Sequence, residues 1–68
     1  MPKKIRELKS DLRRAGWYLK PGAGKGSHSV WEHSNVPYNV TVSGHDGHDA
    51  QRYQEIMVRK AVKAAEGK

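Results

Sequence analysis

Gly26, Ser27 and His28 are the residues of this chain whose types are best suited to chemistry. They follow a basic, glycine-rich segment that begins at Lys20 and reaches Lys25. Glycine lets a backbone approach a ligand closely, and the two lysines place positive charge beside the histidine. Because imidazole both accepts and donates protons near neutral pH, this stretch favours chemistry at a phosphodiester, and we expect that phosphodiester to be RNA.

The residues around the histidine are also candidates for binding phosphate. Backbone N–H groups in a glycine-rich turn can form an anion-binding concavity, so we expect Lys20, Lys25, Gly26 and Ser27 to contact RNA. An ordinary hairpin turn is the alternative, because Pro-Gly and Gly-Lys-Gly are common in turns. The segment is not a P-loop, since its spacing differs and a strand, not a helix, is expected after it.

Three further histidines lie later in the chain. His33 and His45 are candidates for a second proton-transfer group. The segment from His45 to Asp49, which reads His-Asp-Gly-His-Asp, contains residue types that bind metal ions but no recognised ligand spacing. A solvated polar loop is the simpler interpretation, and we expect neither a metal ion nor a cofactor.

The composition limits the class of protein. We expect one domain over residues 1–68, with a small core and no disulfide, because the chain has no cysteine. The 13 Lys and Arg residues against 7 Asp and Glu give a net charge of +6, which favours an anionic partner. The charged N-terminus and the lack of a long apolar run predict a cytoplasmic protein with no membrane contact.

Two segments have the periodicity of amphipathic helices. The first covers residues 3–15, ends before Gly16, and has one apolar face formed by Ile5, Leu8, Leu12 and Ala15. The second covers residues 50 to about 65, with Asp49 as the expected N-cap. Its expected apolar stripe consists of Tyr53, Ile56, Met57, Ala61 and Ala64, widened by Val58 and Val62.

Strands are predicted over residues 17–20, 28–33 and 38–42, from their aromatic and β-branched residues and their alternation. We expect Trp17 and Tyr38 in the core, with base stacking as the alternative. Val30 and Trp31 must point to opposite faces of a sheet, which leaves open which of them is buried. Short connections predict an antiparallel three-stranded sheet with both helices on one face. This two-layer α-β-β-β-α order is that of the α+β fold of double-stranded-RNA-binding domains.

The chain resembles a known family, the HicA toxins. The resemblance covers nearly the whole chain and rests on Gly16-Trp17, the basic glycine turn, Gly26-Ser27-His28, Val30-Trp31-Glu32-His33, Thr41-Val42 and the loop with His45. It implies a double-stranded-RNA-binding-like fold and a toxin that cleaves bacterial mRNA without metal. It also implies that His28 is the catalytic histidine and that a HicB-type antitoxin covers the His28 face. We expect no direct DNA binding.

Two features depart from the family pattern. Ser43-Gly44-His45 stands where a proline- or valine-histidine pair is usual, and the loop before the last helix contains histidine and aspartate where lysines are usual. Two other functions therefore stay open at this stage. One is a non-catalytic RNA-binding domain of the same fold, and the other is a protein-interaction module whose basic faces meet an acidic partner.

Overall fold

Two helices and three strands follow one another in the computed structural model, which describes residues 2–22 and 28–66. Their bounds are α1 Ile5–Arg14, β1 Tyr18–Leu19, β2 His28–His33, β3 Val36–Ser43 and α2 Arg52–Glu66. The order predicted from the sequence is confirmed, and β2 has the predicted bounds. β3 begins earlier than predicted and includes Pro37, which is tolerated because β3 is an edge strand.

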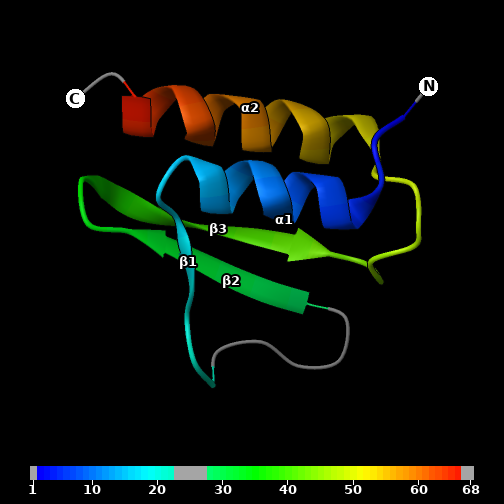
Figure 1. Cartoon of the computed structure of the whole chain (residues 1–68), viewed down its shortest axis with the longest axis horizontal. Helices are drawn as coiled ribbons and strands as arrows, with labels where there is room; N and C mark the ends of the chain where they lie inside the picture. Colours follow the sequence, from blue (N-terminus) through cyan, green and yellow to red (C-terminus); the bar gives the residue numbers. More distant parts are fainter. Residues whose placement is uncertain (1, 23–27, 67–68) are drawn as a thin grey trace.

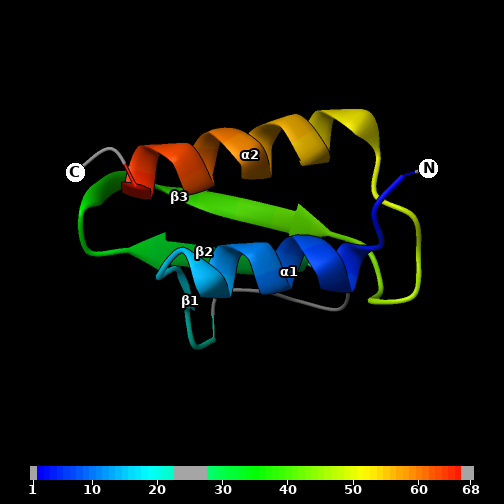
Figure 2. The same cartoon turned by 45° about the horizontal axis from the view of Figure 1, so that its top comes forward.

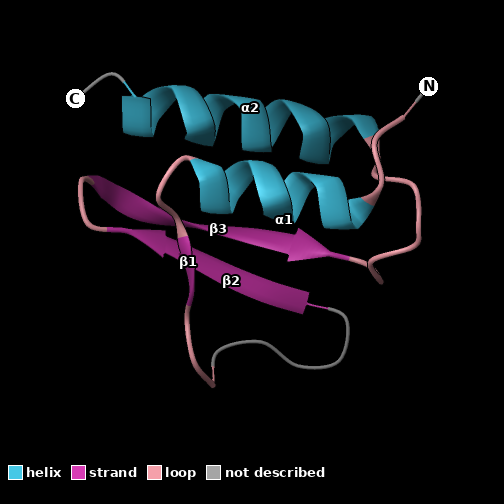
Figure 3. Cartoon of the chain, viewed as in Figure 1, coloured by secondary structure: helices cyan, strands magenta, loops and turns pink. Residues whose placement is uncertain are grey.

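The three strands form one antiparallel sheet in the order β1-β2-β3. Both helices pack on the same side of it, so the two-layer α+β class is confirmed. In Figure 2 the sheet lies behind the helices, with β3 visible between them. Figure 3 shows that α1 and α2 run side by side, and Figure 1 shows that both begin at the end of the molecule where β3 ends and β2 begins.

The core lies between the helices and the sheet. Its buried side chains are Ile5, Leu8 and Leu12 from α1, Trp17, Trp31, Val36, Val40 and Val42 from the sheet side, and Ala50, Val58 and Ala61 from the α2 side. Trp31 faces the helices, so Val30 points to the opposite face. Both buried indoles have partners, because Trp31 Nε1 donates to Ser29 Oγ at 3.0 Å and Trp17 Nε1 to the carbonyl of Ala61 at 3.3 Å.

Two predictions about burial were wrong. Tyr38 is 48% exposed, because the ring of Trp17, 2% exposed, takes the buried position at this end of the sheet. The Tyr38 ring packs against that indole with centroids 6.1 Å apart. Tyr53 and Ile56 of the predicted α2 stripe are exposed as well, because the buried face of α2 is rotated toward Gln54. Val58 and Ala61 are buried as predicted, and the predicted residues Met57, Val62 and Ala64 pack against the core.

Gln54 fixes that rotation of α2. Its side chain is 4% exposed, and its Oε1 accepts the backbone N–H of Ser43 at 2.9 Å. A buried amide that satisfies a strand N–H is costly to remove, because both groups would lose their partner. The polar side chain therefore holds α2 against the end of β3, a role that an apolar-stripe prediction does not detect.

Gly16 connects α1 to β1 in a conformation that other residues avoid. Its φ is +97°, and a Cβ at this position would lie 2.9 Å from Nε2 of His33. We expect Gly16→Ala to lower the free energy of unfolding by about 1–2 kcal/mol for the backbone alone, and by more for the clash. Urea unfolding followed by circular dichroism measures this change.

Two other glycines serve as controls for Gly16→Ala. Gly22 has a φ of +72° in open space, so Gly22→Ala isolates the backbone term, while Gly47 has neither constraint. The expected order of destabilisation is Gly16, then Gly22, then Gly47. Equal effects at Gly16 and Gly22 would show that the approach to His33 is unimportant.

Candidate active site

His28 stands at the start of β2, directly opposite Ser43 at the end of β3. It is exposed. Its position next to the end of β3 brings the following residues, Gly44 and His45, to the same end of the sheet. The polar loop after β3 and the start of β2 therefore form one site, although they are far apart in the sequence.

A cleft of about 490 Å³ lies at this end of the sheet. It is lined by Lys9, Leu19, Lys20, Pro21, Gly22, His28, Ser29, Gly44, His45 and Asp46. Three of the residues singled out from the sequence, Lys20, His28 and His45, thus share a cleft. The other predicted phosphate-binding residues, Lys25, Gly26 and Ser27, lie outside the described residues.

Backbone pairing holds Lys20 at the cleft. Its N–H donates to the carbonyl of Val30 at 2.8 Å, which extends the pairing of β1 with β2 past Leu19. The pairing fixes the backbone of Lys20 at the wall of the cleft. A cation held beside an exposed histidine suits an anionic substrate better than a neutral one.

The loop after β3 is tied to the beginning of α1. The N–H of Ile5 donates to the carbonyl of His48 at 2.9 Å, and the N–H of Arg6 donates to the carbonyl of Asp46 at 3.2 Å. These helix N–H groups have no partner within a helix, so loop carbonyls take the positions that an anion would otherwise occupy. Positive charge in the cleft must therefore come from side chains, not from the α1 terminus.

Two ion pairs between aspartates of the same loop and lysines at α1 also hold the loop in place. Lys9 Nζ lies 2.7 Å from Asp46 Oδ1, and Lys4 Nζ lies 2.6 Å from Asp49 Oδ1. Each lysine, by hydrogen bond and by charge, lowers the pKa of its carboxyl partner. Asp49 was predicted to cap α2, and this is wrong: α2 begins at Arg52, and the Asp49 side chain instead binds Lys4 near the start of α1.

The histidines of this loop contact each other instead of forming a metal site. The rings of His45 and His48 pack edge to face with centroids 5.2 Å apart. Asp46 and Asp49 are occupied by the two lysines. Among residues 2–22 and 28–66, no group of three His, Asp or Glu side chains could hold a metal ion.

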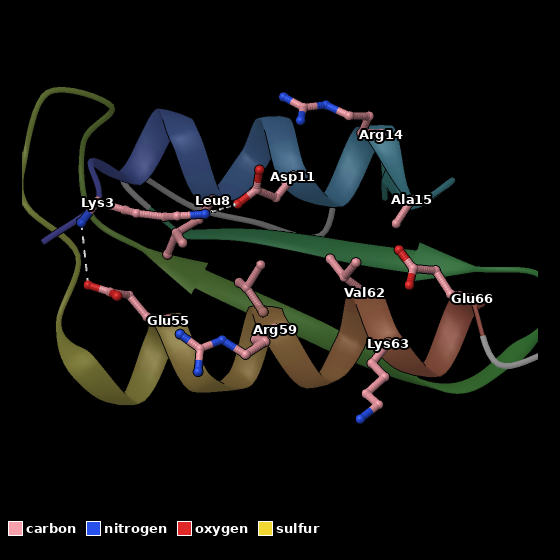
Figure 4. Close-up of a pocket in the computed structure, with 11 residues that line it drawn as sticks. Lys3, Leu8, Asp11, Arg14, Ala15, Glu55, Arg59, Val62, Lys63 and Glu66 are labelled. Carbon is pink, nitrogen blue, oxygen red and sulfur yellow. Dashed lines mark hydrogen bonds and ion pairs between the residues drawn. The ribbon is translucent and has the colours of Figure 1, made fainter.

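A second cleft, of about 520 Å³, lies between α1 and α2. Figure 4 shows its polar lining, in which Lys3 binds Asp11 through Nζ at 2.6 Å and Glu55 through its backbone N–H at 3.4 Å. Leu8, Val58 and Val62 form its apolar part. No histidine lines it, so proton transfer at neutral pH is better served by the His28 cleft.

With this geometry established, comparison with known protein families identifies the chain. The model of a family described as HicA toxin of bacterial toxin–antitoxin matches residues 5–65. The chain belongs to the HicA toxin family. Searches of the curated proteins and of the solved structures gave no significant match.

Membership of the HicA family implies an antitoxin partner for this chain. The match extends from α1 to the last turns of α2, and so includes every element that surrounds the His28 cleft. Of the helices that the structure describes, neither has the length and apolar character needed to cross a membrane.

His33 is not brought to the cleft of this HicA protein. It stands at the far end of β2 from His28, about 16 Å away at roughly 3.3 Å per residue. Its Nε2 donates to the carbonyl of Ala15 at 3.1 Å, and its Nδ1 accepts the N–H of Asn35 at 3.0 Å. Both ring nitrogens are therefore used, which fixes the neutral tautomer with the proton on Nε2.

The ring of His33 also packs edge to face on Trp17, with centroids 5.5 Å apart. Together these contacts join the end of α1, the turn after β2 and the core indole. The geometry thus supports a structural role for His33, and does not support the second proton-transfer role that the sequence left open for it.

Lys9 and Asp46 are cleft residues that sequence reasoning missed. On the sequence, Lys9 belongs to the charged face of α1, and Asp46 to a solvated loop 37 positions further on. The one available signal is the position of Lys9 directly after the buried Leu8, at the border of the apolar face. A lysine at this border is expected to contact a neighbouring segment of the fold, but the sequence does not show which segment.

The structural role of His33 gives a testable prediction. His33→Leu removes the hydrogen bonds to the part-buried carbonyl of Ala15 and to the exposed N–H of Asn35. Because water can replace the partner of the exposed N–H, we expect the free energy of unfolding to fall by about 0.5–1.5 kcal/mol. His33→Gln, which retains a donor and an acceptor, should lose less. His48→Leu, at an exposed ring, is the control; an effect of His33→Leu no larger than this control would contradict the assignment.

Proposed function

We propose that this HicA protein is a metal-independent endoribonuclease that cleaves mRNA, with His28 as its catalytic histidine. The observation that supports this most directly is the shared cleft, in which an exposed His28 stands beside Lys20 and His45. A net charge of +6 adds a general attraction for a polyanion. Family membership supplies the class of protein, and the cleft supplies groups suited to this reaction.

Cleavage of RNA without metal needs only groups of the kind that line this cleft. The 2′-oxygen loses its proton and attacks the adjacent phosphorus, and the bond from phosphorus to the 5′-oxygen breaks. The products are a 2′,3′-cyclic phosphate and a 5′-hydroxyl, whose oxygen takes up a proton. His28 acts as the general base or general acid in this sequence, and His45 is the candidate for the opposite transfer.

Lysines provide the electrostatic part of the proposed reaction. Negative charge builds on the non-bridging oxygens as the fifth bond to phosphorus forms, and a cation held nearby stabilises that charge. Lys20 lines the cleft, which supports it as the candidate for this role. Lys25, Gly26 and Ser27 stay candidates for holding the same phosphate, on the evidence of the sequence alone.

We further propose that the antitoxin is of the HicB type and covers the open face of the sheet, including His28. Alternation along the strands turns the paired residues Val30 and Thr41, and Tyr18 and Glu32, away from the helices. Tyr18 is half exposed there. A partner seated on this face would reach His28 at its border and exclude RNA.

Replacing His28 tests the catalytic proposal. We expect His28→Ala to leave the circular dichroism spectrum unchanged, because the side chain is exposed, and to lower the rate of RNA cleavage in EDTA by about 10²–10⁴-fold. Wild-type products should end in 2′,3′-cyclic phosphate. Tyr53→Ala, at an exposed residue of α2 that does not line the cleft, should cleave at close to the wild-type rate.

The outcome also separates the alternatives. Full activity of a folded His28→Ala protein would contradict the assignment of His28. RNA binding without cleavage by the wild-type chain would favour a non-catalytic RNA-binding domain, and absence of RNA affinity at physiological salt would favour a protein-interaction module.

A charge placed on the open face tests the antitoxin proposal. We expect Tyr18→Glu to weaken binding of the antitoxin by about tenfold or more, since buried tyrosines are frequent hot spots, without slowing RNA cleavage by the free toxin. Calorimetry and inhibition of cleavage measure the two effects. Tyr53→Glu, at an exposed tyrosine of α2, is the matched control, and equal losses for both variants would rule out the sheet face.

A further inference from the structure

The charges of α1 are divided between its two flanks. Arg6, Lys9 and Arg13 are three and four positions apart, so they form one stripe along the helix. The acidic residues of α1, Glu7 and Asp11, lie on the other flank. Both are already engaged there, since Glu7 accepts the backbone N–H of Lys4 at 2.7 Å and Asp11 binds Lys3 Nζ at 2.6 Å.

The basic stripe borders the His28 cleft. Lys9 lines the cleft itself. Arg13 lies over the ring of Trp31, with Cζ 5.1 Å from the ring centroid. Trp31 is in turn paired across the sheet with Leu19, which lines the cleft. The stripe spans about 10 Å along α1, with Lys9 between Arg6 and Arg13, so it extends the positive surface from the cleft toward both ends of the helix.

One member of the stripe is bound to an acidic side chain of the same chain. Lys9 Nζ lies 2.7 Å from Asp46 Oδ1, and 20% of the Lys9 side chain is exposed against 64% of the Asp46 side chain. The charges of Arg13 and Arg6 act on the same carboxyl and, with Lys9, lower its pKa. Asp46 thus binds Lys9 from the loop that also carries His45, and its backbone carbonyl accepts the N–H of Arg6.

A carboxylate on an ammonium occupies the position of a phosphate oxygen, because both are anionic acceptors of the same N–H groups. An ion pair with an exposed partner is weak and is screened by salt. A phosphate that also meets Arg6 and Arg13 makes more charge-assisted contacts than the single carboxylate does. Exchange of Asp46 for a phosphate at Lys9 therefore favours the bound nucleic acid.

We propose that Arg6, Lys9 and Arg13 form a second binding site for RNA phosphates, next to the scissile one, and that Asp46 occupies this site in the free protein. The proposal rests on the proposed function, because it takes RNA as the ligand. Asp46 yields Lys9 to a phosphate when RNA enters the cleft. Asp46 thereby lowers the affinity of the free toxin for RNA.

Binding of a single-stranded RNA oligonucleotide to the His28→Ala protein, measured against salt concentration, tests the site. We expect Arg13→Gln to weaken binding several-fold and to reduce the slope of log K against log salt by about 0.7, the value for one phosphate contact on a single strand. Arg14→Gln removes the same charge from the neighbouring position, at the α1–α2 cleft, and should leave the slope unchanged. Equal effects of the two variants would overturn the proposal.

Two matched variants, Asp46→Asn and Asp49→Asn, test the role of Asp46. Asp46→Asn should strengthen RNA binding several-fold, whereas Asp49→Asn, which breaks the pair with Lys4, should have little effect. The gain from Asp46→Asn should disappear in a Lys9→Gln background, because the two residues act on one another. In Lys9→Gln, carbon NMR should also show the pKa of Asp46 rising toward its ordinary value.

These outcomes are distinct from failure of the proposed function. If the wild-type chain cleaves RNA while Arg13→Gln and Arg14→Gln behave alike, the second site is wrong and the nuclease proposal stands. If the wild-type chain neither binds nor cleaves RNA, the proposed function fails and its extension fails with it. Loss of antitoxin binding without loss of RNA binding in Arg13→Gln would assign the stripe to the antitoxin and overturn the RNA site.

Discussion

The pairing of β2 with β3 decides which side chains of β2 belong to the core and which stand at the cleft. The register sets Trp31 opposite Val40, with both facing the helices, and sets His28 opposite Ser43 at the sheet end. A slip of one residue would send every side chain of β2 to the other face. The buried indole therefore fixes the register, and the register places His28 beside the loop with His45.

The same constraint separates the histidines by role. His33 has both ring nitrogens engaged and a buried indole against it, so its ring is held as part of the fold. His28 and His45 are exposed and line one cleft, where their rings are open to a substrate. One residue type thus supports the fold at one end of β2 and chemistry at the other.

Sequence patterns predicted the elements that depend on local periodicity. Leu8 and Leu12 are buried as expected, and β2 has its expected bounds, because a helical stripe and a short aromatic strand are local signals. Tyr38 and Asp49 were misplaced because their surroundings are set by distant residues, the indole of Trp17 and the ammonium of Lys4. Gln54 escaped notice for the same reason, since its partner is the backbone of β3.

Less of the candidate site could be predicted than of the fold. His28, Lys20 and His45 were found by residue type, and their common cleft depends on the sheet register. Lys9 and Asp46 could not be found, because a lysine on a helix and an aspartate in a loop are each ordinary solvated residues until the fold brings them within 2.7 Å. An ion pair between distant elements has no sequence signal comparable to a buried stripe.

Helix α1 links stability to the proposed chemistry. Its apolar face holds the sheet, its first N–H groups hold the loop with His45, and its basic flank borders the cleft. Because loop carbonyls already occupy those N–H groups, the proposed phosphate site on this helix depends on the side chains of Arg6, Lys9 and Arg13 and not on the helix dipole. A charge carried by a side chain can be changed one residue at a time while the helix stays folded. Under the proposal, a single residue such as Asp46 therefore adjusts the affinity of this cleft for RNA.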